Sequence, residues 1–384
     1  MSRHALVIGA GLAGAAVCAQ LARRGWRITL LEAADGPARG ASALPVGMLS
    51  PHVTRAPTPL SRLSALGVDT TRGELQRLLP QGQGWQACEV DNLGHDQGRW
   101  PAALVRPGAL VHAWLDEAGP ALQARWRTPV HGLARTGDQA WQALDATGSV
   151  LAQAPVLVVA AAFDSLALLT TGEGLLPQAH LPLRPVKGQM SLAALDGEAL
   201  ADRPRRDNGV FVPRYDDSGL PPAWPARIWA MGSTYTRGDA STHLSDEAHA
   251  ANASSLQALC PPAAERMRQT QARGALLGWA QVRCASLDRL PLVGAAVDTV
   301  ALNDELARAR GRHGRIALED MPRLPGLHLC TAFGSRGITL APLCAALLAA
   351  RLEEDASPLE PDLVRALDPA RFAWRQARRQ VQVR

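Results

Sequence analysis

The segment that most constrains the fold of this chain is Val7-Ile8-Gly9-Ala10-Gly11-Leu12-Ala13-Gly14, close to its N-terminus. A short apolar strand over residues 5–8 leads into a glycine-rich turn, and an apolar helical pattern follows. In this order the first two glycines allow a tight turn and a close approach of backbone to a pyrophosphate, and the third lets the helix pack closely on the strand. The helix N-terminus then faces the phosphates. The sequence therefore predicts a dinucleotide site that uses Gly9, Gly11 and Gly14.

A second strand, residues 27–31, ends at Glu32 and supports this interpretation. A carboxylate at this place suits the 2′-hydroxyl of a ribose and repels the 2′-phosphate of NADP. The pattern thus favours FAD or NAD. The simpler alternative, a glycine-rich turn that binds no nucleotide, does not account for strand, turn, helix, strand and acid occurring in this order.

Composition limits the class of protein. A chain of 384 residues can form two domains, each with a core. Hydrophobic residues make up 47% of it, but no apolar run is long enough to cross a bilayer, so we expect no membrane association. The six cysteines show neither a CxxC motif nor metal-ligand spacing, which predicts no disulfide framework, no metal site and a reducing, cytoplasmic location.

The charge of the chain is basic, with a net charge of +5 carried almost wholly by arginine, and Lys187 is the only lysine. The last segment, residues 371–384, contains five arginines and no acid. Such a segment can bind a phosphate backbone or only keep the protein in solution, and charge alone leaves both possibilities open.

Between the two ends of the chain, segments with a strand-like apolar pattern alternate with segments of helical periodicity. We expect strands at residues 85–92, 140–144 and 155–160, helices at 74–79, 106–118 and 246–259, and a β-rich region from 181 to about 283. Small residues dominate 36–58, which makes this segment either a connector or a loop that approaches a flavin through Gly40 and Ser42.

A second glycine turn lies near the C-terminus. A strand over residues 327–333 leads into Gly334-Ser335-Arg336-Gly337, and a helix follows from Ile338 to residue 352. Its N-terminus also directs partial positive charge at a ligand. One helix can hold the pyrophosphate while the other stabilises negative charge on a reduced flavin. We therefore predict cofactor contacts from residues 334–338, against the alternative that the glycines only shape the turn.

Taken together, these residues resemble the FAD-dependent amine oxidoreductases of the D-amino-acid oxidase and glycine oxidase family. Within it they most resemble the oxidoreductase domain of a bifunctional tRNA-modifying enzyme. The segments that carry the resemblance are, besides the first turn, 23–26, Gly188-Gln189, 232–238, 282–285, 290–294, 334–337, 341–345 and 367–371.

The resemblance implies an α/β fold with a discontinuous, Rossmann-like FAD domain (1–81, 102–178 and 284–384) and a mainly β substrate domain (82–101 and 179–283). It implies noncovalent FAD, with Val130 and Gly294 among the contacts. Some sarcosine-oxidising relatives attach flavin through a cysteine near Cys284, but we expect a buried, unreactive thiol there. Since the chain opens at the FAD strand, we also expect it to lack the methyltransferase step.

The implied substrate is 5-carboxymethylaminomethyluridine, with or without 2-thiolation, at the wobble position of tRNA. Oxidation of a CH–NH bond and hydrolysis would give glyoxylate and 5-aminomethyluridine, with the cofactor carrying the difficult step. A substrate carboxylate requires a planar, bidentate cation, and the resemblance assigns this role to Arg283 and Arg336. Tyr235 completes the predicted catalytic set, with Arg237 beside it.

Three alternatives remain open. The first is an oxidase of free glycine, sarcosine or a D-amino acid that produces hydrogen peroxide, and the second is a tRNA-binding flavoprotein without catalysis. The third, an NAD dehydrogenase, accounts for the sequence least well, because the turn at residues 334–337 would have no role in it. The roles of Lys187 and of the loop 41–52, which departs from the family pattern, are also open, as is the oligomeric state, for which a monomer is plausible.

Overall fold

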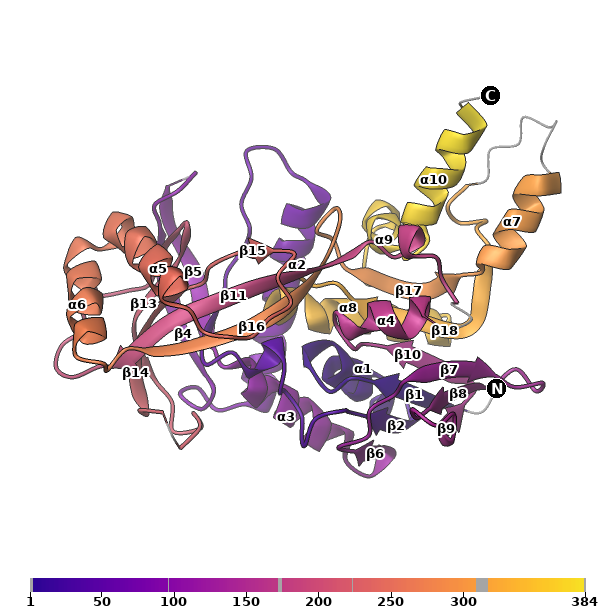
Figure 1. Ribbon diagram of the computed structural model, residues 1–384, viewed down its shortest axis with the longest axis horizontal. Helices are drawn as coiled ribbons and strands as arrows, with labels where there is room; N and C mark the ends of the chain where they lie inside the picture. Colours follow the sequence, from indigo (N-terminus) through magenta and orange to yellow (C-terminus); the bar gives the residue numbers. More distant parts are fainter. Residues whose placement is uncertain (1–2, 96, 172–174, 223, 309–316, 383–384) are drawn as a thin grey trace.

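The computed structural model describes residues 3–95, 97–171, 175–222, 224–308 and 317–382. Two large sheets lie beside one another along the long axis of the molecule (Figure 1). One has six strands and helices packed on it, and the other has nine strands, with a helix pair at the far end of the molecule.

The six-stranded sheet has the order β17-β18-β10-β1-β2-β6. All neighbouring strands are parallel except β17, which pairs antiparallel with β18. The central strands β1 and β10 are apolar and buried along nearly their whole length, because both faces of the sheet are covered there, as is usual for parallel strands. Their bounds are β1 (His4–Ile8), β2 (Arg27–Leu31), β6 (Leu122–Arg125), β10 (Val156–Val159), β17 (Leu292–Val297) and β18 (Arg323–Thr331).

Four helices pack together on one face of this sheet: α1 (Leu12–Ala22), α2 (Pro59–Leu78), α3 (Pro107–Ala118) and α8 (Gly337–Glu353). Helix α1 is buried almost all round because α3 and α8 cover its sides, which explains its uniformly apolar sequence. The other face carries a three-stranded sheet and three helices. These are β7 (Gly132–Arg135), β8 (Trp141–Leu144), β9 (Val150–Ala154), α4 (Asp164–Thr170), α7 (Thr299–Arg308) and α10 (Arg371–Gln382).

The prediction of a short helix at residues 74–79 was wrong in its start, because α2 begins at Pro59. Thr58 caps it by accepting a hydrogen bond from the backbone N–H of Ser61, and Pro59 suits the first turn. Half of the buried residues of α2 are small or polar, among them Gly67 and Thr71, so few large apolar side chains mark its buried face in the sequence.

Helix α2 contains two glycines, Gly67 and Gly73, that differ in the space around them. A Cβ at Gly67 would lie 2.3 Å from the carbonyl oxygen of Thr339 in α8, whereas a Cβ at Gly73 would meet nothing within 4 Å. We expect Gly67→Ala to lower the free energy of unfolding by about 1 to 3 kcal/mol through overpacking, and Gly73→Ala to raise it by about 0.5 to 1 kcal/mol through helix propensity. Chemical denaturation of the two variants measures both, and equal effects would contradict this account of the α2–α8 contact.

The nine-stranded sheet has the order β15-β11-β14-β13-β12-β4-β5-β3, with β16 also paired to β11. Segments far apart in the sequence meet here, and the predicted boundaries between the two domains stay a prediction. The strands are β3 (Gly47–Leu49), β4 (Trp85–Asn92), β5 (Gly98–Val105), β11 (Leu183–Ala194), β12 (Arg205–Asp207), β13 (Gly209–Asp216), β14 (Arg227–Gly232), β15 (Thr236–Arg237) and β16 (Leu277–Ser286).

Helices α5 (Asp246–Leu259) and α6 (Pro261–Ala272) cover one face of the nine-stranded sheet. The sequence predicted α5 with its observed bounds but not α6. Pro261, directly after α5 and its cap, occupies the first turn of α6, where a proline loses no hydrogen bond.

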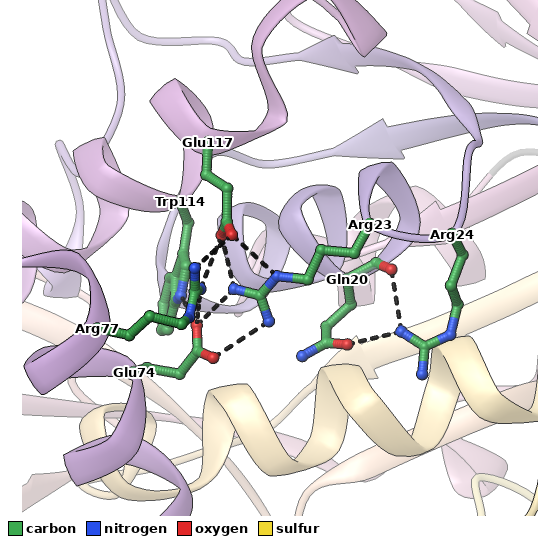
Figure 2. A network of polar contacts seen from close by, with 7 residues as sticks. All are labelled: Gln20, Arg23, Arg24, Glu74, Arg77, Trp114 and Glu117. Atoms are coloured by element: carbon green, nitrogen blue, oxygen red, sulfur yellow. Dashed lines mark hydrogen bonds and ion pairs between the residues drawn. The ribbon is translucent and has the colours of Figure 1, made fainter.

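A polar network ties α1, α2 and α3 together (Figure 2). Arg23, just after α1, lies 2.6 Å from the carboxylates of both Glu74 and Glu117, and the Trp114 indole donates to Glu74 at 2.7 Å. Arg77 also pairs with Glu117, at 2.6 Å. Burial alone would raise the pKa of Glu74, but the hydrogen bonds from Arg23 and Trp114 outweigh it and lower that pKa. Arg23 therefore has a structural role in holding α2 and α3 to the C-terminal end of α1, the end opposite the first glycine turn.

The basic C-terminal segment is not a free tail. Helix α9 (Pro361–Leu367) precedes α10, and Arg371 at the start of α10 is only 1% exposed. It donates to Asp288 at 2.8 Å, and Arg375 pairs with the same carboxylate at 2.9 Å. Arg371 is thus unavailable to a phosphate backbone, while Arg384 lies outside the described residues. None of the described helices is long and apolar enough to span a bilayer.

The pairing of Asp288 predicts a loss of stability in acid. Burial would raise the pKa of Asp288, but Arg371 and Arg375 lower it from 3.8 to about 2. A carboxyl with a lowered folded-state pKa stabilises the protein above its unfolded pKa and loses this effect as the pH falls from about 4 to about 2. We expect a contribution of up to about 2 kcal/mol, less after solvent screening, that is absent in Asp288→Asn. Unfolding measured from pH 7 to pH 2 should show a shallower acid dependence in the variant; identical curves would contradict the assignment.

Candidate active site

A cavity of about 370 Å³ is lined by residues from both large sheets and from both glycine turns. The first turn and the loop after it contribute backbone and small side chains, and the nine-stranded sheet contributes larger ones. Among the lining residues are Gly11, Leu12, Ala13, Ala41, Ser42, Met190, Ser233, Tyr235, Trp279, Gln281, Arg283, Cys284, Gly334, Ser335, Gly337 and Ile338. Predicted site residues from distant parts of the sequence are therefore brought together.

The first glycine turn leaves no room for side chains. Gly9 has φ +101°, and a Cβ there would lie 2.7 Å from the carbonyl oxygen of Ala160. A Cβ on Gly14 would lie 1.8 Å from the carbonyl oxygen of Gly9. The N-terminus of α1 consequently approaches β1 closely and presents the backbone of Gly11 to the cavity. Ser42 secures the adjoining loop, since its hydroxyl accepts a hydrogen bond from the Leu12 N–H at 3.0 Å.

Glu32 lies at the end of β2, beside this turn. Its carboxylate accepts hydrogen bonds from the N–H groups of Ala10 at 2.6 Å and Ala34 at 2.9 Å. A carboxylate has about four acceptor positions, so Glu32 is held in place and can still accept from a ribose. The backbone of Glu32 also accepts from Thr128. Val130, two residues further on, packs against a hydrophobic core and does not line the cavity.

The second turn brings the N-terminus of α8 to the same cavity. Gly334 has φ +55° and its N–H donates to the carbonyl of Cys284 at 2.7 Å, which joins the turn to β16. Gly337 lies against Leu12 of the first turn. Besides Val130, six other predicted cofactor contacts do not themselves line the cavity: Gly9, Gly14, Glu32, Arg336, Gly294, which lies against Arg351, and Gly40, which has open space around it.

Arg283 projects from β16 into the cavity. Its guanidinium donates to the hydroxyl of Ser233 and to the carbonyl of Thr234 at 3.4 Å, and it lies 5.9 Å from the centre of the Tyr235 ring. Burial lowers its pKa, and no carboxylate pairs with it among the described residues. Gly188 in β11 makes space for it, because a Cβ there would lie 2.2 Å from the guanidinium nitrogens.

Arg336 lies beside the cavity but is not among the residues that line it. It precedes α8, between Ser335 and Gly337, which both line the cavity. Burial and the neighbouring charge of Arg289 lower its pKa, and within the described ranges it makes no ion pair. Two largely buried guanidiniums without carboxylates form a site that favours an anionic ligand, since burying a charge without a partner is unfavourable.

Gln189 is a residue whose part in the site we did not predict. Its fully buried side-chain amide exchanges two hydrogen bonds with the backbone of Ser245, at 2.8 and 2.9 Å. Its backbone pairs with Thr234 in both directions, which fixes the chain on the N-terminal side of Tyr235. The sequence offered no signal for this role beyond the family resemblance of the Gly188-Gln189 pair.

Lys187, whose role the sequence leaves open, lies close to an acidic and a hydroxyl side chain. Lys187 donates to the Ser241 hydroxyl at 3.0 Å and lies 3.5 Å from Asp239, so its ammonium is engaged within the β11–β15 region.

Cys284 lines the cavity, and burial raises the pKa of its thiol to about 12. A neutral thiol is a poor nucleophile, which supports noncovalent binding of a flavin. Among the described residues, no group of three metal-ligating side chains could hold a metal ion.

Substitution of Gly188 tests the placement of Arg283. A methyl group in Gly188→Ala would displace the guanidinium, whose end is flexible, without breaking the backbone pairing of β11 with β16. We expect a carboxylate-bearing substrate to bind about tenfold more weakly, because a bidentate contact depends on position. The melting temperature should change little. Steady-state kinetics of the holoenzyme decides; an unchanged KM would show that Arg283 does not hold the substrate in this position.

The fold and the site define a flavoenzyme of the DAO type. The family model described as "FAD dependent oxidoreductase" matches residues 4–104 and 99–351, and the chain belongs to this family. The family, its α/β fold and FAD as cofactor are thereby confirmed.

The names of curated relatives describe a narrower function than the family model does. The chain is 36% identical over 423 aligned residues to the tRNA 5-methylaminomethyl-2-thiouridine biosynthesis bifunctional protein MnmC of Cupriavidus necator, covering 98% of this chain and 61% of that protein. The protein of the same name from Cupriavidus metallidurans is 37% identical, with 98% and 60% covered. The chain therefore spans about three fifths of the length of these relatives.

Solved structures show the same fold at low identity. Glycine oxidase from Geobacillus kaustophilus superposes with a TM-score of 0.69 at 17% identity, covering 96% of this chain and 98% of that one. Iminodiacetate oxidase from Chelativorans sp. BNC1 gives a TM-score of 0.64, also at 17% identity, with 93% and 97% covered.

The residues present suit FAD. The turn admits only backbone at Gly9 and Gly14, Glu32 is fixed beside it, and the N-termini of α1 and α8 both reach the cavity. Oriented N–H groups and helix dipoles of this kind favour the pyrophosphate and a negatively charged ring. When bound, FAD supplies the acceptor for two electrons from the substrate.

Proposed function

We propose that this enzyme removes the carboxymethyl group from 5-carboxymethylaminomethyluridine, with or without 2-thiolation, at the wobble position of tRNA. The observation that carries the proposal is the similarity along 98% of the chain to proteins named for tRNA 5-methylaminomethyl-2-thiouridine biosynthesis. The site agrees with it, because Arg283 and Arg336 offer a carboxylate two cations that the described residues leave unpaired. Such an enzyme would act on tRNA in the cytoplasm.

The residues of this chain would bind and orient the substrate. Arg283 holds the glycine-like carboxylate through two N–H donors, and Arg336 adds a second cation. Tyr235 also lines the cavity, with its ring centre 5.9 Å from the Arg283 guanidinium. The reaction removes two electrons and two protons across the CH–NH bond. Water then adds to the substrate imine, and cleavage of the C–N bond leaves glyoxylate and the 5-aminomethyl group.

A second candidate is an oxidase of a free small amine, such as glycine, sarcosine or a D-amino acid. The glycine oxidase fold favours it, and both arginines would serve it equally well. A tRNA-binding flavoprotein without catalysis is less consistent with a cavity that joins the FAD cradle to Arg283. We retain the predicted division into an FAD domain and a substrate domain as part of this proposal.

Anaerobic reduction of the flavin by different substrates distinguishes the candidates. The purified holoenzyme is mixed with tRNA carrying the carboxymethylaminomethyl group, with unmodified tRNA, and with free glycine, sarcosine and D-alanine. Loss of oxidised flavin absorbance only with the modified tRNA is expected. Reduction by a free amino acid and not by tRNA would assign a small-molecule oxidase, and reduction by none of them would remove the catalytic proposals.

A further inference from the structure

The cavity region contains more desolvated positive charge than one carboxylate requires. Arg206, Arg283 and Arg336 all have a pKa lowered by burial, and none makes an ion pair within the described part of the chain. Elsewhere, poorly exposed arginines such as Arg106 and Arg371 are paired with carboxylates, at 2.7 and 2.8 Å. Because removing a charge from water is unfavourable without a counter-charge, the third arginine points to a second anion.

Arg206 lies on β12, directly opposite Val210 of β13, which lines the cavity. Its guanidinium donates through Nη1 to the hydroxyl of Ser50 and to the carbonyl of Pro51 at 3.0 Å, and through Nε to Asn92 at 3.2 Å. All three acceptors are uncharged. Nη2 donates no hydrogen bond to any described residue, so one edge of the guanidinium remains available to a ligand.

Two further groups that can contact an anion, His52 and Arg289, lie near the segment that Arg206 contacts. His52 follows Ser50 and Pro51 and is half-buried, with its backbone N–H bonded to Ser64. Burial, then the charges of Arg336, Arg206 and Arg289, lower the pKa of His52. Arg289 is exposed and, across the described ranges, makes no ion pair. All three arginines act electrostatically on the same imidazole, and a bound anion would offset their positive charge.

We propose that Arg206, together with His52 and Arg289, binds a phosphodiester group of the RNA adjoining the nucleotide in the cavity. This inference rests on the proposed function. A modified nucleotide within RNA carries two kinds of anion, a carboxylate on the base and phosphates on the backbone, whereas a free amino acid carries only the first. Arg283 and Arg336 take the carboxylate, and the planar fork of Arg206 suits a phosphate. The arrangement therefore selects a nucleotide in RNA over a free amine.

Two substrates that differ in phosphate test this. The nucleoside 5-carboxymethylaminomethyluridine has the carboxylate and no phosphate, and an anticodon stem-loop RNA carries the same nucleoside at the wobble position. Anaerobic flavin reduction at varied concentration gives an apparent Kd and a limiting rate for each. For Arg206→Gln we expect an apparent Kd for RNA raised about tenfold and a salt dependence shallower by roughly 0.7 to 1 in log–log slope. Binding of the nucleoside and both limiting rates should be unchanged.

Matched variants separate this role from a structural one. Arg206→Lys, which keeps the charge and loses the fork, should recover part of the RNA affinity. Arg268→Gln, an exposed arginine of α6, should leave both substrates unaffected. If Arg206→Gln does not fold, exposed Arg289→Gln serves in its place with the same expectation. Equal weakening for nucleoside and RNA, or no weakening for either, would overturn the inference while leaving the proposed function intact. Failure of the wild type to be reduced by either substrate would overturn the proposed function itself.

Discussion

Arg283→Ala is expected to lower kcat/KM for the carboxylate-bearing substrate by about 10² to 10³-fold. Removing one partner of a buried, hydrogen-bonded charge pair costs about 2 to 5 kcal/mol, and each 1.36 kcal/mol is a factor of ten in rate. The loss should come without loss of FAD, since Arg283 lies on β16 of the nine-stranded sheet and belongs to neither glycine turn. Stopped-flow reduction of the flavin in the purified variant measures the effect.

Two controls make this result specific. Arg184→Ala removes an exposed arginine from the neighbouring strand β11 and should leave kcat/KM unchanged. A substrate analogue with an amide in place of the carboxylate should react poorly with the wild type and be insensitive to Arg283→Ala. If the variant lost the same factor with the amide as with the carboxylate, Arg283 would not be the residue that recognises the negative charge.

Gly14→Ala is expected to yield a protein without FAD and with greatly reduced stability. The added Cβ would lie 1.8 Å from the carbonyl oxygen of Gly9, a backbone atom that cannot move away as a flexible side chain can. The helix must shift from β1, at a cost near or above the upper end of the usual range for overpacking, about 3 kcal/mol. The same shift opens the turn that faces the pyrophosphate.

Flavin absorbance relative to protein absorbance, followed by thermal unfolding, measures both consequences of Gly14→Ala. Gly73→Ala serves as the control, because the same substitution in α2 meets no atom within 4 Å. Full flavin content in Gly14→Ala would contradict the role of this glycine in the α1–β1 contact.

Features encoded in contiguous sequence were predictable. The first glycine turn, β2 with Glu32, and α5 each depend on signals that lie within one short segment, and the structure confirms all three elements. Helix α2 was predicted too short, because its contact with α8 depends on small residues such as Gly67 that carry no apolar signal.

Residues brought together across the sequence were harder to predict. Arg206 lies in a short polar stretch that is typical of a surface turn, and only the pairing of β12 with β4 and β13 carries it to Ser50 beside the cavity. The role of Gly188 becomes visible only where β11 pairs with β16. Conversely, Arg371 belongs to an arginine-rich segment whose composition is typical of a protein surface. It is nevertheless buried against Asp288, which lies 83 residues earlier in the sequence.

The central claim is that this enzyme removes a carboxymethyl group from the wobble nucleotide of tRNA. The most direct measurement is nucleoside mass analysis of tRNA bearing 5-carboxymethylaminomethyluridine after incubation with the holoenzyme, with glyoxylate quantified in the same reaction. The account predicts conversion to 5-aminomethyluridine with one glyoxylate formed for each nucleoside converted. Unchanged tRNA from a preparation whose flavin is rapidly reduced by free glycine or sarcosine would contradict it.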